Sequence, residues 1–329
     1  MPTLRRRLLN LLTALNVRVH DLEPGSALIS RHRDYTVTPL GRGRWMVGRG
    51  ERARPRTLAD LLDGRPGAQW KAVPLGPGSV MFSDRKQSPE EEQQTHKAAQ
   101  EHLGAEHVAS LLTHYRVNCV LDVGANIGQY ATRLRRYGYT GRIASFEPVP
   151  ATAEKLREAA ADDPEWHVYP YALGREDRTD TINVVYGSMS SLLDPSDFGT
   201  SRYKRFRRSR EERITVRRLD GLLEEVFTGL DDPRPYLKLD TQGFDLEAYA
   251  GCGDHIGRFV GMQSEVALLQ IYEGMPRMGE AIATYEADGF EITGMYPVTR
   301  EESTGRVLEF DCVMARADAL PEGSERTDH

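Results

Sequence analysis

The segment from Cys119 to Pro148 constrains the fold more than any other part of the sequence. An apolar run, Cys119–Val123, stops at a turn that contains glycine, and a helical pattern follows. A second apolar run, Arg142–Phe146, ends on Glu147 and Pro148. Strand, turn, helix and strand in this order make a βαβ unit, whose strands pair in parallel through a right-handed crossover. The sequence therefore predicts an α/β fold built around a parallel sheet.

The turn after the first strand narrows the range of ligands. A dinucleotide-binding turn has the pattern G-x-G-x-x-G, whose middle glycine lets a pyrophosphate approach the backbone. Counted from Gly124, the other two glycine positions hold Asn126 and Gln129, so this pattern is absent. What remains is Gly124 and Gly128 after Asp122, and the next helix still offers free N–H groups to an anion. A carboxylate fits such a site as well as a phosphate does.

An acidic residue at the end of the second strand is a candidate for binding another part of the same ligand. Glu147 follows the apolar run that ends at Phe146, where a carboxylate accepts hydrogen bonds from both hydroxyls of a ribose. A carboxylate site at the turn and a ribose site at Glu147 together describe S-adenosylmethionine better than NAD. The alternative is an ordinary α/β core in which the turn and the acid are structural.

Composition excludes several classes of protein. The 329 residues suffice for one large domain and one small one. A net charge of −6 argues against a protein whose whole surface binds nucleic acid. Cys119, Cys252 and Cys312 have no metal-ligand spacing and do not suggest a disulfide framework, which fits a reducing cytoplasm. No apolar run reaches the ~18 residues of a membrane span. We therefore expect a cytoplasmic protein.

Residues 1–88 predict a small N-terminal α+β extension. The arginines and leucines of residues 1–16 resemble the start of a signal peptide, but no small-residue cleavage site follows, which favours an amphipathic helix. The role of the extension stays open between a substrate cap, a homodimer contact and a passive flank. The β-prone runs of this region are Ala27–Ser30, Tyr35–Pro39 and Arg44–Val47, and Thr57–Leu62 predicts a short helix.

Strands and helices alternate along residues 89–316, which we predict to form the main domain. A capping box at Ser88–Glu91 starts one or two helices that run to about Tyr115, with Gly104 at the break. The order predicts a doubly wound sheet of seven strands with a terminal antiparallel hairpin, and a disordered tail over 317–329. After Phe146 the expected strands are Trp166–Leu173, Thr181–Tyr186, Ile214–Val216, Tyr236–Leu239, Phe259–Val266, Phe290–Tyr296 and Leu308–Met314.

In doubly wound sheets, ligands bind outside the carboxyl ends of the strands. Five residues with useful chemistry or position fall at or near those ends in the predicted order. These residues are Asp122, Glu147, Leu173, Asp240 and Glu265.

Six motifs lie in order along this region: LDVGANIGQ (Leu121–Gln129), SFEPVP (Ser145–Pro150), YALG (Tyr171–Gly174), SSLL (Ser190–Leu193), LKLDTQGFDLE (Leu237–Glu247) and QSEVALLQIYEG (Gln263–Gly274). Their order and spacing resemble the FkbM family of S-adenosylmethionine-dependent methyltransferases. The resemblance covers roughly residues 95–316 and leaves out the N-terminal extension. In one departure, Gln270 and Ile271 stand where many relatives carry Pro-Leu.

The resemblance implies a class I, Rossmann-like methyltransferase fold with S-adenosylmethionine as methyl donor. It also implies O-methylation of a hydroxyl on a small molecule such as a polyketide or a sugar. Carried over residue by residue, the methionine end of the cofactor falls to Asp122, Gly124, Asn126 and Gly128, the ribose to Glu147, and the adenine to Ala172 and Leu173.

Asp240 and Glu265 are the candidate catalytic residues. Both end neighbouring strands of the predicted sheet, so Asp240 is expected to face the transferred methyl group and to take the proton of the acceptor hydroxyl. Two carboxylates at adjacent strand ends can also hold a divalent metal such as Mg²⁺. In a third alternative, Asp240 only holds the Thr241–Gly243 turn.

Other polar residues are candidates for holding the acceptor. Gln242, Tyr272 and Ser190 are assigned to substrate binding, although buried glutamine and tyrosine side chains also serve to satisfy local hydrogen bonds. His114 and His167 have the right chemistry for a base, but their positions in the predicted fold favour structural roles.

The run Arg202–Arg218 is strongly basic and carries Tyr203 and Phe206. It is interpreted as a solvated helix, as a site for an anionic acceptor, or as an RNA-binding segment. The sequence predicts an O-methyltransferase that acts on a small-molecule hydroxyl in natural-product or glycan tailoring. The alternatives are an RNA methyltransferase that uses residues 202–218 and a cofactor-binding protein without transfer activity.

Overall fold

The computed structural model describes the backbone of residues 18–23, 26–30, 35–41, 44–49, 70–76, 79–84, 89–185, 187, 189–301 and 303–321, with side chains from Lys97 onward. The chain divides into two compact units, residues 1–102 and 103–329. The predicted helices over 1–16 and Thr57–Leu62 and the predicted Ser88 cap lie outside the described residues. Residues 317–321, predicted as the start of a disordered tail, include the short 3₁₀ helix η3 (Ala317–Ala319) and pack against the core.

The described part of the first unit consists of antiparallel strands and the beginning of α3 (Pro89–His114). β1 (Arg18–Glu23) pairs with β2 (Ser26–Ser30). A second sheet has the order β3-β4-β6-β5. The predicted β-prone runs fall within β2, β3 and β4, whereas β1, β5 and β6 were not expected. The four strands are β3 (Tyr35–Gly41), β4 (Arg44–Arg49), β5 (Trp70–Gly76) and β6 (Ser79–Asp84).

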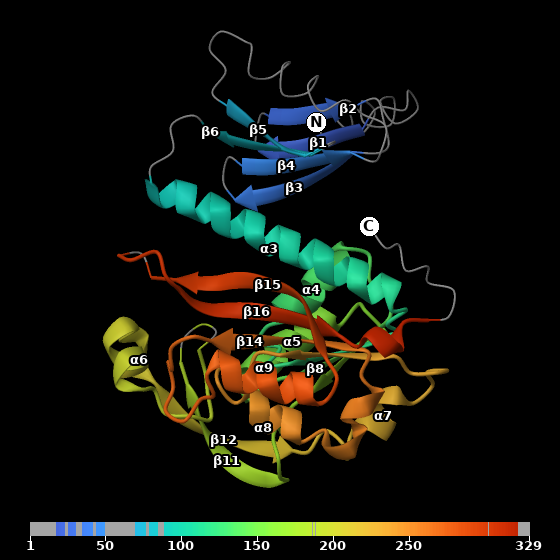
Figure 1. The fold of residues 1–329 in the computed structure, drawn as a ribbon, viewed down its shortest axis with the longest axis vertical. Coiled ribbons are helices and arrows are strands. Elements are labelled where there is room, and N and C mark those ends of the chain that lie inside the picture. Colours follow the sequence, from blue (N-terminus) through green and yellow to red (C-terminus); the bar gives the residue numbers. More distant parts are fainter. Residues whose placement is uncertain are drawn as a thin grey trace. The chain divides into compact units, whose positions relative to one another are not determined.

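A seven-stranded sheet forms the centre of the second unit, in the order β15-β16-β14-β13-β7-β8-β9 (Figure 1). The last five strands of this order run parallel, and β16 lies antiparallel between β14 and β15. This arrangement confirms the predicted class I methyltransferase fold with its inserted hairpin. The strands are β7 (Cys119–Val123), β8 (Arg142–Phe146), β9 (Trp166–Tyr169), β13 (Pro235–Leu239), β14 (Gly261–Ala267), β15 (Glu291–Arg300) and β16 (Val307–Ala315).

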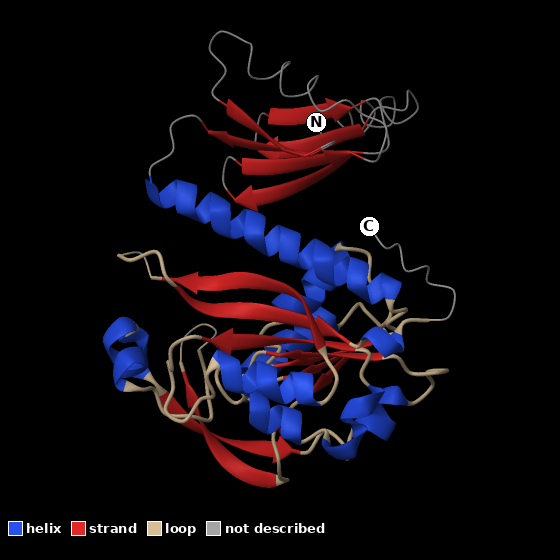
Figure 2. Ribbon diagram, viewed as in Figure 1, coloured by secondary structure: helices blue, strands red, loops and turns tan. Residues whose placement is uncertain are grey.

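Helices cover both faces of this sheet (Figure 2). On one face, α3 (Pro89–His114), α4 (Gln129–Arg136) and α5 (Pro150–Ala160) bury Leu112, Leu134 and Leu156. On the other, α7 (Leu223–Phe227), α8 (Asp245–Ala250) and α9 (Met278–Ala287) bury Leu223, Tyr249 and Tyr285. β7 and β13 are buried along their whole length, which explains why both are apolar apart from Asp122 and Lys238. None of the helices in the described part of the chain has the length and apolar character to cross a membrane.

The predicted third strand, Trp166–Leu173, is two strands. β9 ends at Tyr169, and β10 (Ala172–Leu173) joins a separate three-stranded sheet with the order β10-β12-β11. Pro170 lies at the break, and its missing N–H group prevents continuous pairing with a neighbouring strand. β11 (Arg178–Val184) and β12 (Arg210–Arg217) pair antiparallel in this second sheet.

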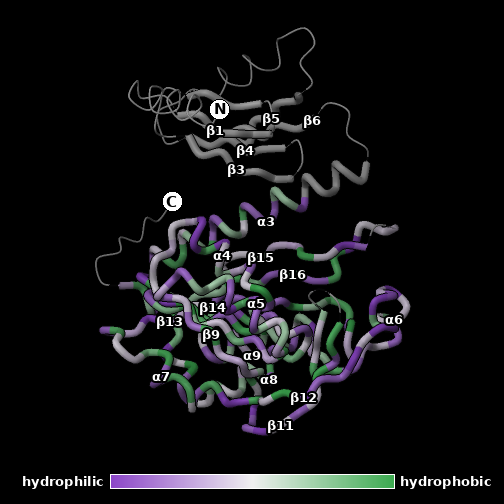
Figure 3. The backbone as a smooth tube through the Cα atoms, turned by 180° about the vertical axis from the view of Figure 1, so that it is seen from behind, coloured by the Kyte–Doolittle hydropathy of each residue, from purple (hydrophilic) through white to green (hydrophobic). Residues whose placement is uncertain are grey.

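The interpretation of residues 202–218 as one basic helix is wrong. The segment contains the end of α6 (Asp197–Arg202), the 3₁₀ helix η1 (Lys204–Arg208) and the strand β12. Ile214, Thr215 and Val216 are β-branched and pair with β11, and this ladder extends through the charged residues before them. The tube around α6 is largely hydrophilic, whereas hydrophobic stretches concentrate in the central sheet (Figure 3).

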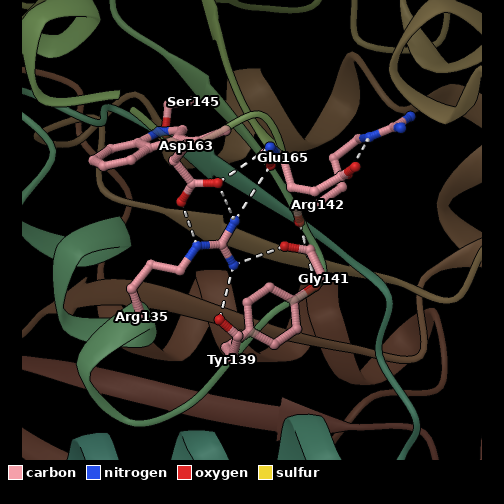
Figure 4. Close-up of polar contacts among 8 residues, drawn as sticks. Arg135, Tyr139, Gly141, Arg142, Ser145, Asp163 and Glu165 are labelled. Atoms are coloured by element: carbon pink, nitrogen blue, oxygen red, sulfur yellow. Dashed lines mark hydrogen bonds and ion pairs between the residues drawn. The ribbon is translucent and has the colours of Figure 1, made fainter. Parts of the chain in front are cut away.

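An arginine at the end of α4 holds the first βαβ unit together (Figure 4). Arg135 Nε donates to Asp163 Oδ2 over 2.6 Å, and Arg135 Nη1 donates to the carbonyl oxygens of Tyr139 and Gly141 over 2.9 and 2.8 Å. One guanidinium therefore joins α4, the loop before β8 and the loop before β9.

Candidate active site

The turn between β7 and α4 is left-handed at three of its five residues. Gly124, Asn126 and Gly128 have φ values of 76°, 50° and 87°. A Cβ atom on Gly124 would lie 1.9 Å from the carbonyl oxygen of Asp240, and one on Gly128 would lie 2.7 Å from the Trp166 ring. The two glycines are therefore required by close packing as well as by φ. The turn lies directly against the end of β13, where Asp240 follows the strand.

Asp122 lies beneath the turn, fully buried at 0% exposure. Its Oδ2 accepts a hydrogen bond from Ser145 Oγ over 3.4 Å, and Ser145 Oγ accepts one from Trp166 Nε1 over 2.9 Å. Its Oδ1 lies 3.1 Å from Lys238 Nζ. Both oxygens of Asp122 are thus engaged by protein groups, so this carboxylate supports the turn from below.

Glu147 lies beside the turn and is fixed by two main-chain groups. Its Oε2 accepts from Asn126 N and its Oε1 from Val149 N, each over 2.9 Å. Burial raises the pKa of Glu147 to about 7, although these hydrogen bonds oppose the rise. Each oxygen keeps a second lone pair that a ligand hydroxyl can use.

The predicted adenine residues separate into two environments. Ala172 packs with Val149, close in sequence to Glu147, and with Ile214 of β12. Leu173 is 1% exposed and belongs to the core under α7 and α8. Ala172 is therefore near the Glu147 side of the site, whereas Leu173 lies in the hydrophobic core.

Lys238 is a buried lysine that sequence reasoning missed, because it lies inside the apolar run of β13. Its side chain is 7% exposed. The Nζ atom lies 3.1 Å from Asp122 Oδ1 and 3.3 Å from Asp240 Oδ2, and donates to the carbonyl oxygen of Gly124 over 3.4 Å. It also lies 5.4 Å from the centre of the Tyr130 ring. Lys238 therefore connects the strand, the turn and the candidate base.

Gln242 joins the two candidate catalytic carboxylates. Its Nε2 donates to Asp240 Oδ1 over 3.1 Å and to Glu265 Oε2 over 2.9 Å. Its Oε1 accepts from the Tyr272 hydroxyl over 3.0 Å. Gln242 has a φ of 55°, an unusual conformation for a residue other than glycine, which often marks a functional turn. The structure thus brings Asp240, Glu265, Gln242 and Tyr272 together.

The surroundings shift the pKa values of the two carboxylates in opposite directions. Burial acts to raise the pKa of Asp240, but Lys238 and hydrogen bonds from Gln242 and Glu265 bring it below its ordinary value. Burial, together with Glu309 and Asp240, raises the pKa of Glu265 well above its ordinary value. The surroundings therefore favour the ionised form of Asp240 and the protonated form of Glu265. Asp240 remains accessible, with 40% of its side chain exposed.

Ser190 is not in this network. Its hydroxyl accepts from Val185 N over 3.1 Å and is held within its own loop. The neighbouring Ser191, which sequence reasoning did not select, is 1% exposed and donates to the carbonyl oxygen of Gln242 over 2.8 Å. Through Ser191, the SSLL motif holds the turn at Gln242. The motif itself was the sequence signal, although Ser190 and not Ser191 was selected from it.

Asp240 and Glu265 do not fit a divalent metal. The amide nitrogen of Gln242 donates to one oxygen of each carboxylate, and the lone pairs that accept from it are not offered to a cation. No group of three or more His, Cys, Asp or Glu residues in the described part of the chain is arranged to hold a metal ion. The Thr241–Gly243 turn is held by Asp245, whose Oδ1 accepts from Thr241 N over 3.1 Å.

η1 adjoins this network through an aromatic contact. The Phe206 and Tyr272 rings meet edge to face with centroids 5.5 Å apart, and Phe206 is buried. In β12 and after it, Arg210, Arg217 and Arg218 form ion pairs with Glu212, Asp177 and Asp220. Within the described residues, no ion pair involves the exposed basic residues of η1, namely Lys204, Arg205, Arg207 and Arg208.

The sequence profile of the methyltransferase FkbM domain matches residues 122–292, the segment that contains the turn, Glu147, Asp240 and Glu265. The chain belongs to the FkbM methyltransferase family. The family establishes a methyltransferase that uses S-adenosylmethionine, as the sequence motifs predicted. No curated protein sequence matches the chain.

Several solved structures are similar at low identity. Fibrillarin from Aeropyrum pernix with S-adenosyl-L-methionine has 12% identity and a TM-score of 0.37, covering 85% of this chain and 98% of its own. Magnesium protoporphyrin IX methyltransferase from Synechocystis PCC 6803 with bound SAM has 10% identity and a TM-score of 0.38, covering 70% and 86%. An rRNA methylase from Streptococcus thermophilus has 11% identity and a TM-score of 0.36, covering 66% and 96%.

Proposed function

We propose that this FkbM methyltransferase transfers the methyl group of S-adenosylmethionine to a hydroxyl of a small molecule, with Asp240 as the general base. The observation that supports this proposal is an ionised, accessible carboxylate whose main-chain oxygen lies against the cofactor turn at Gly124. A base at this place lies near both the donor and the acceptor. A hydroxyl needs such a base because its pKa is high.

The cofactor is proposed to lie along the turn and Glu147. Main-chain N–H groups at the start of α4, beside Asn126 and Gly128, would hold its carboxylate. The remaining lone pairs of Glu147 would accept from its ribose hydroxyls, and Ala172 would lie near its adenine. Asp122 and Leu173, which are fully buried, support this site without touching the cofactor.

The residues of this chain perform three tasks in the proposed reaction. S-adenosylmethionine, when bound, supplies an electrophilic methyl group on a sulfonium. Gln242 and Tyr272 orient the acceptor, and Asp240 accepts the hydroxyl proton as the new O–C bond forms and the C–S bond breaks. The products are a methyl ether and S-adenosylhomocysteine. Alignment of the oxygen with the methyl group supplies much of the rate.

The test begins with transfer of labelled methyl from S-adenosylmethionine into a fractionated extract of the source organism. Label in a small-molecule or glycan fraction supports the proposal and identifies the acceptor.

Asp240→Asn should then lower kcat by about 10²–10⁴-fold while cofactor affinity is retained. Unchanged activity in Asp240→Asn would contradict the role of Asp240. Activity should survive treatment with a chelator, because Gln242 occupies the position between the two carboxylates.

A second candidate function is RNA methylation. The exposed basic residues of η1, next to Tyr203, favour it, because basic side chains and an aromatic ring can bind a single-stranded nucleic acid. Label that enters only RNA in the same extract would support this function and overturn the small-molecule proposal. Salt-sensitive binding of RNA would accompany that outcome.

A further inference from the structure

We infer that Lys238 is a positioning residue that ties the base Asp240 to the cofactor turn and keeps its carboxylate ready to accept the hydroxyl proton. The inference rests on the proposed role of Asp240 as the base. It assigns a task to a lysine that is nearly fully buried and therefore cannot serve as a surface contact.

Three acceptors surround the ammonium group of Lys238. Asp122 Oδ1 lies 3.1 Å from Nζ, Asp240 Oδ2 lies 3.3 Å away, and the carbonyl oxygen of Gly124 lies 3.4 Å away. The contact with Gly124 is a hydrogen bond, and the contacts with Asp122 and Asp240 are ion pairs. The Tyr130 ring lies on a further side, at 5.4 Å. The position of Nζ is therefore determined by the turn and by both carboxylates at once.

Asp122 is in turn held by a fixed chain of donors. Trp166 Nε1 donates to Ser145 Oγ over 2.9 Å, and Ser145 Oγ donates to Asp122 Oδ2 over 3.4 Å. Three neighbouring parallel strands, β9, β8 and β7, contribute these residues. The chain continues from Asp122 through Lys238 to Asp240. A displacement of the cofactor turn would consequently move the base, because both share Lys238.

Acidic groups dominate the remaining surroundings of Asp240. Burial raises the pKa of Asp245 to about 6, of Asp311 to about 6 and of Glu309 to about 7. Without a cation beside it, the pKa of Asp240 would be expected to rise above its ordinary value, as the pKa values of these neighbours do. The charged and titratable groups that face the cluster are Asp122 of β7, Arg133 and Tyr130 of α4, Lys238 of β13, Asp245 of α8, Glu265 of β14, Glu309 and Asp311 of β16, and Tyr203 and Tyr272 from the loops.

Two isosteric substitutions shift the acidity of the base in opposite directions. Lys238→Met removes the positive charge, so the acidic limb of the kcat/KM profile should move to higher pH by about one to three units. Asp122→Asn removes the competing negative charge, so Lys238 acts on Asp240 alone and the acidic limb should move to lower pH. A lysine that only stabilises the fold would not give opposite shifts.

The experiment measures pH profiles of kcat/KM for the full-length wild type, Lys238→Met, Lys238→Arg and Asp122→Asn with the acceptor found by methyl labelling. Circular dichroism and calorimetric binding of S-adenosylmethionine accompany each profile. Lys238→Arg, which keeps the charge, should restore the acidic limb to within about one pH unit of wild type.

Acidic limbs that stay at the wild-type position in both Lys238→Met and Asp122→Asn overturn the inference. If Lys238→Met does not fold, the Asp122→Asn profile decides, because an unmoved or raised limb contradicts the inference and a lowered limb supports it. A failure of the proposed function appears separately, as full activity in Asp240→Asn.

Discussion

At the scale of single residues, the site depends on carboxylates whose surroundings differ. Asp122 has both oxygens engaged and is fully buried, Glu147 is held by main-chain N–H groups, and Asp240 is accessible beside Lys238. Three acids that look alike in sequence therefore have three different environments. Their partners, and not their type, decide the role that is proposed for each one.

Glu147→Ala tests the proposed ribose contact. Loss of two hydrogen bonds to a charged acceptor should weaken binding of S-adenosylmethionine by about ten- to a thousandfold, measured by calorimetry. Glu154→Ala, which removes an exposed carboxylate from α5, is the matched control and should bind as wild type.

The pH dependence of cofactor binding gives a second readout of Glu147. Burial raises the pKa of this carboxyl to about 7, so the folded protein takes up a proton as pH falls from neutral. Affinity for S-adenosylmethionine should decline as pH falls through 7, because the protonated group accepts less well. Glu147→Gln should remove this decline. Affinity in Glu147→Ala equal to wild type would refute the assignment.

Gly124→Ala tests the close approach between the cofactor turn and β13. The new Cβ atom would lie 1.9 Å from the carbonyl oxygen of Asp240 at a φ of 76°, so the free energy of unfolding should fall by about 3–5 kcal/mol. Gly138→Ala is the control, because Gly138 has a φ of 89° with open space around its Cβ position. It should lose only about 1–2 kcal/mol. Equal losses in denaturant titrations would mean that the contact with Asp240 is unimportant.

At the scale of elements, the ends of strands and helices position the site. β7, β8, β13 and β14 all end at one edge of the sheet, and the turns that follow them carry the polar residues. α4 matters because its first turn faces the proposed cofactor carboxylate. The opposite end of α4 must therefore be fixed, and Arg135 does this.

Arg135→Ala should lower the free energy of unfolding by about 2–4 kcal/mol, because the carbonyl groups of Tyr139 and Gly141 lose their donor. Arg135→Lys should recover only part of this, since one ammonium group cannot reach two loops and Asp163 with the same fork geometry. Chemical denaturation measures both. Arg157→Ala, which breaks an exposed pair on α5, should change stability by less than about 1 kcal/mol. If Arg135→Lys were as stable as wild type, the several parallel hydrogen bonds of the guanidinium group would not be needed.

The secondary structure of the second unit was largely predictable from the sequence. Apolar runs and glycine positions placed β7, β8, β13, β14 and the hairpin close to their observed bounds, because each buried strand has a local pattern. The errors lie at β10 and η1, where pairing with β12 and packing of Phe206 override the local signals. Such contacts join residues that are distant in sequence.

At the scale of the whole molecule, charge is distributed unevenly. Carboxylates gather where β13 and β14 end and β16 begins, whereas η1 presents exposed basic residues beside Tyr272. The net charge of −6 conceals this separation. An acceptor with a hydroxyl at one end and an anionic group at the other would match both regions.

Combined replacement of Arg205, Arg207 and Arg208 with Ala tests this match. The KM for an anionic acceptor should rise by about ten- to a hundredfold at low salt with kcat unchanged, and the effect should shrink as salt screens the charges. Lys155→Ala with Arg157→Ala removes charge from α5 and should leave the KM unchanged. A KM that the triple replacement leaves unchanged would contradict both proposed roles of η1, namely binding of an anionic acceptor and binding of RNA.

The motifs of the sequence by themselves pointed to the family, and the sequence also determined the order of the elements and the positions of the glycine turn, Glu147 and Asp240 at strand ends. The elements and strand ends depend on apolar periodicity and glycine spacing, which are local along the chain. Only the tertiary structure decided that Asp122 is buried, that Lys238 lies between two carboxylates, and that Gln242 joins Asp240 to Glu265. The physical reason is that charge state follows from neighbours in space, and the order of strands in the sheet brings those neighbours together.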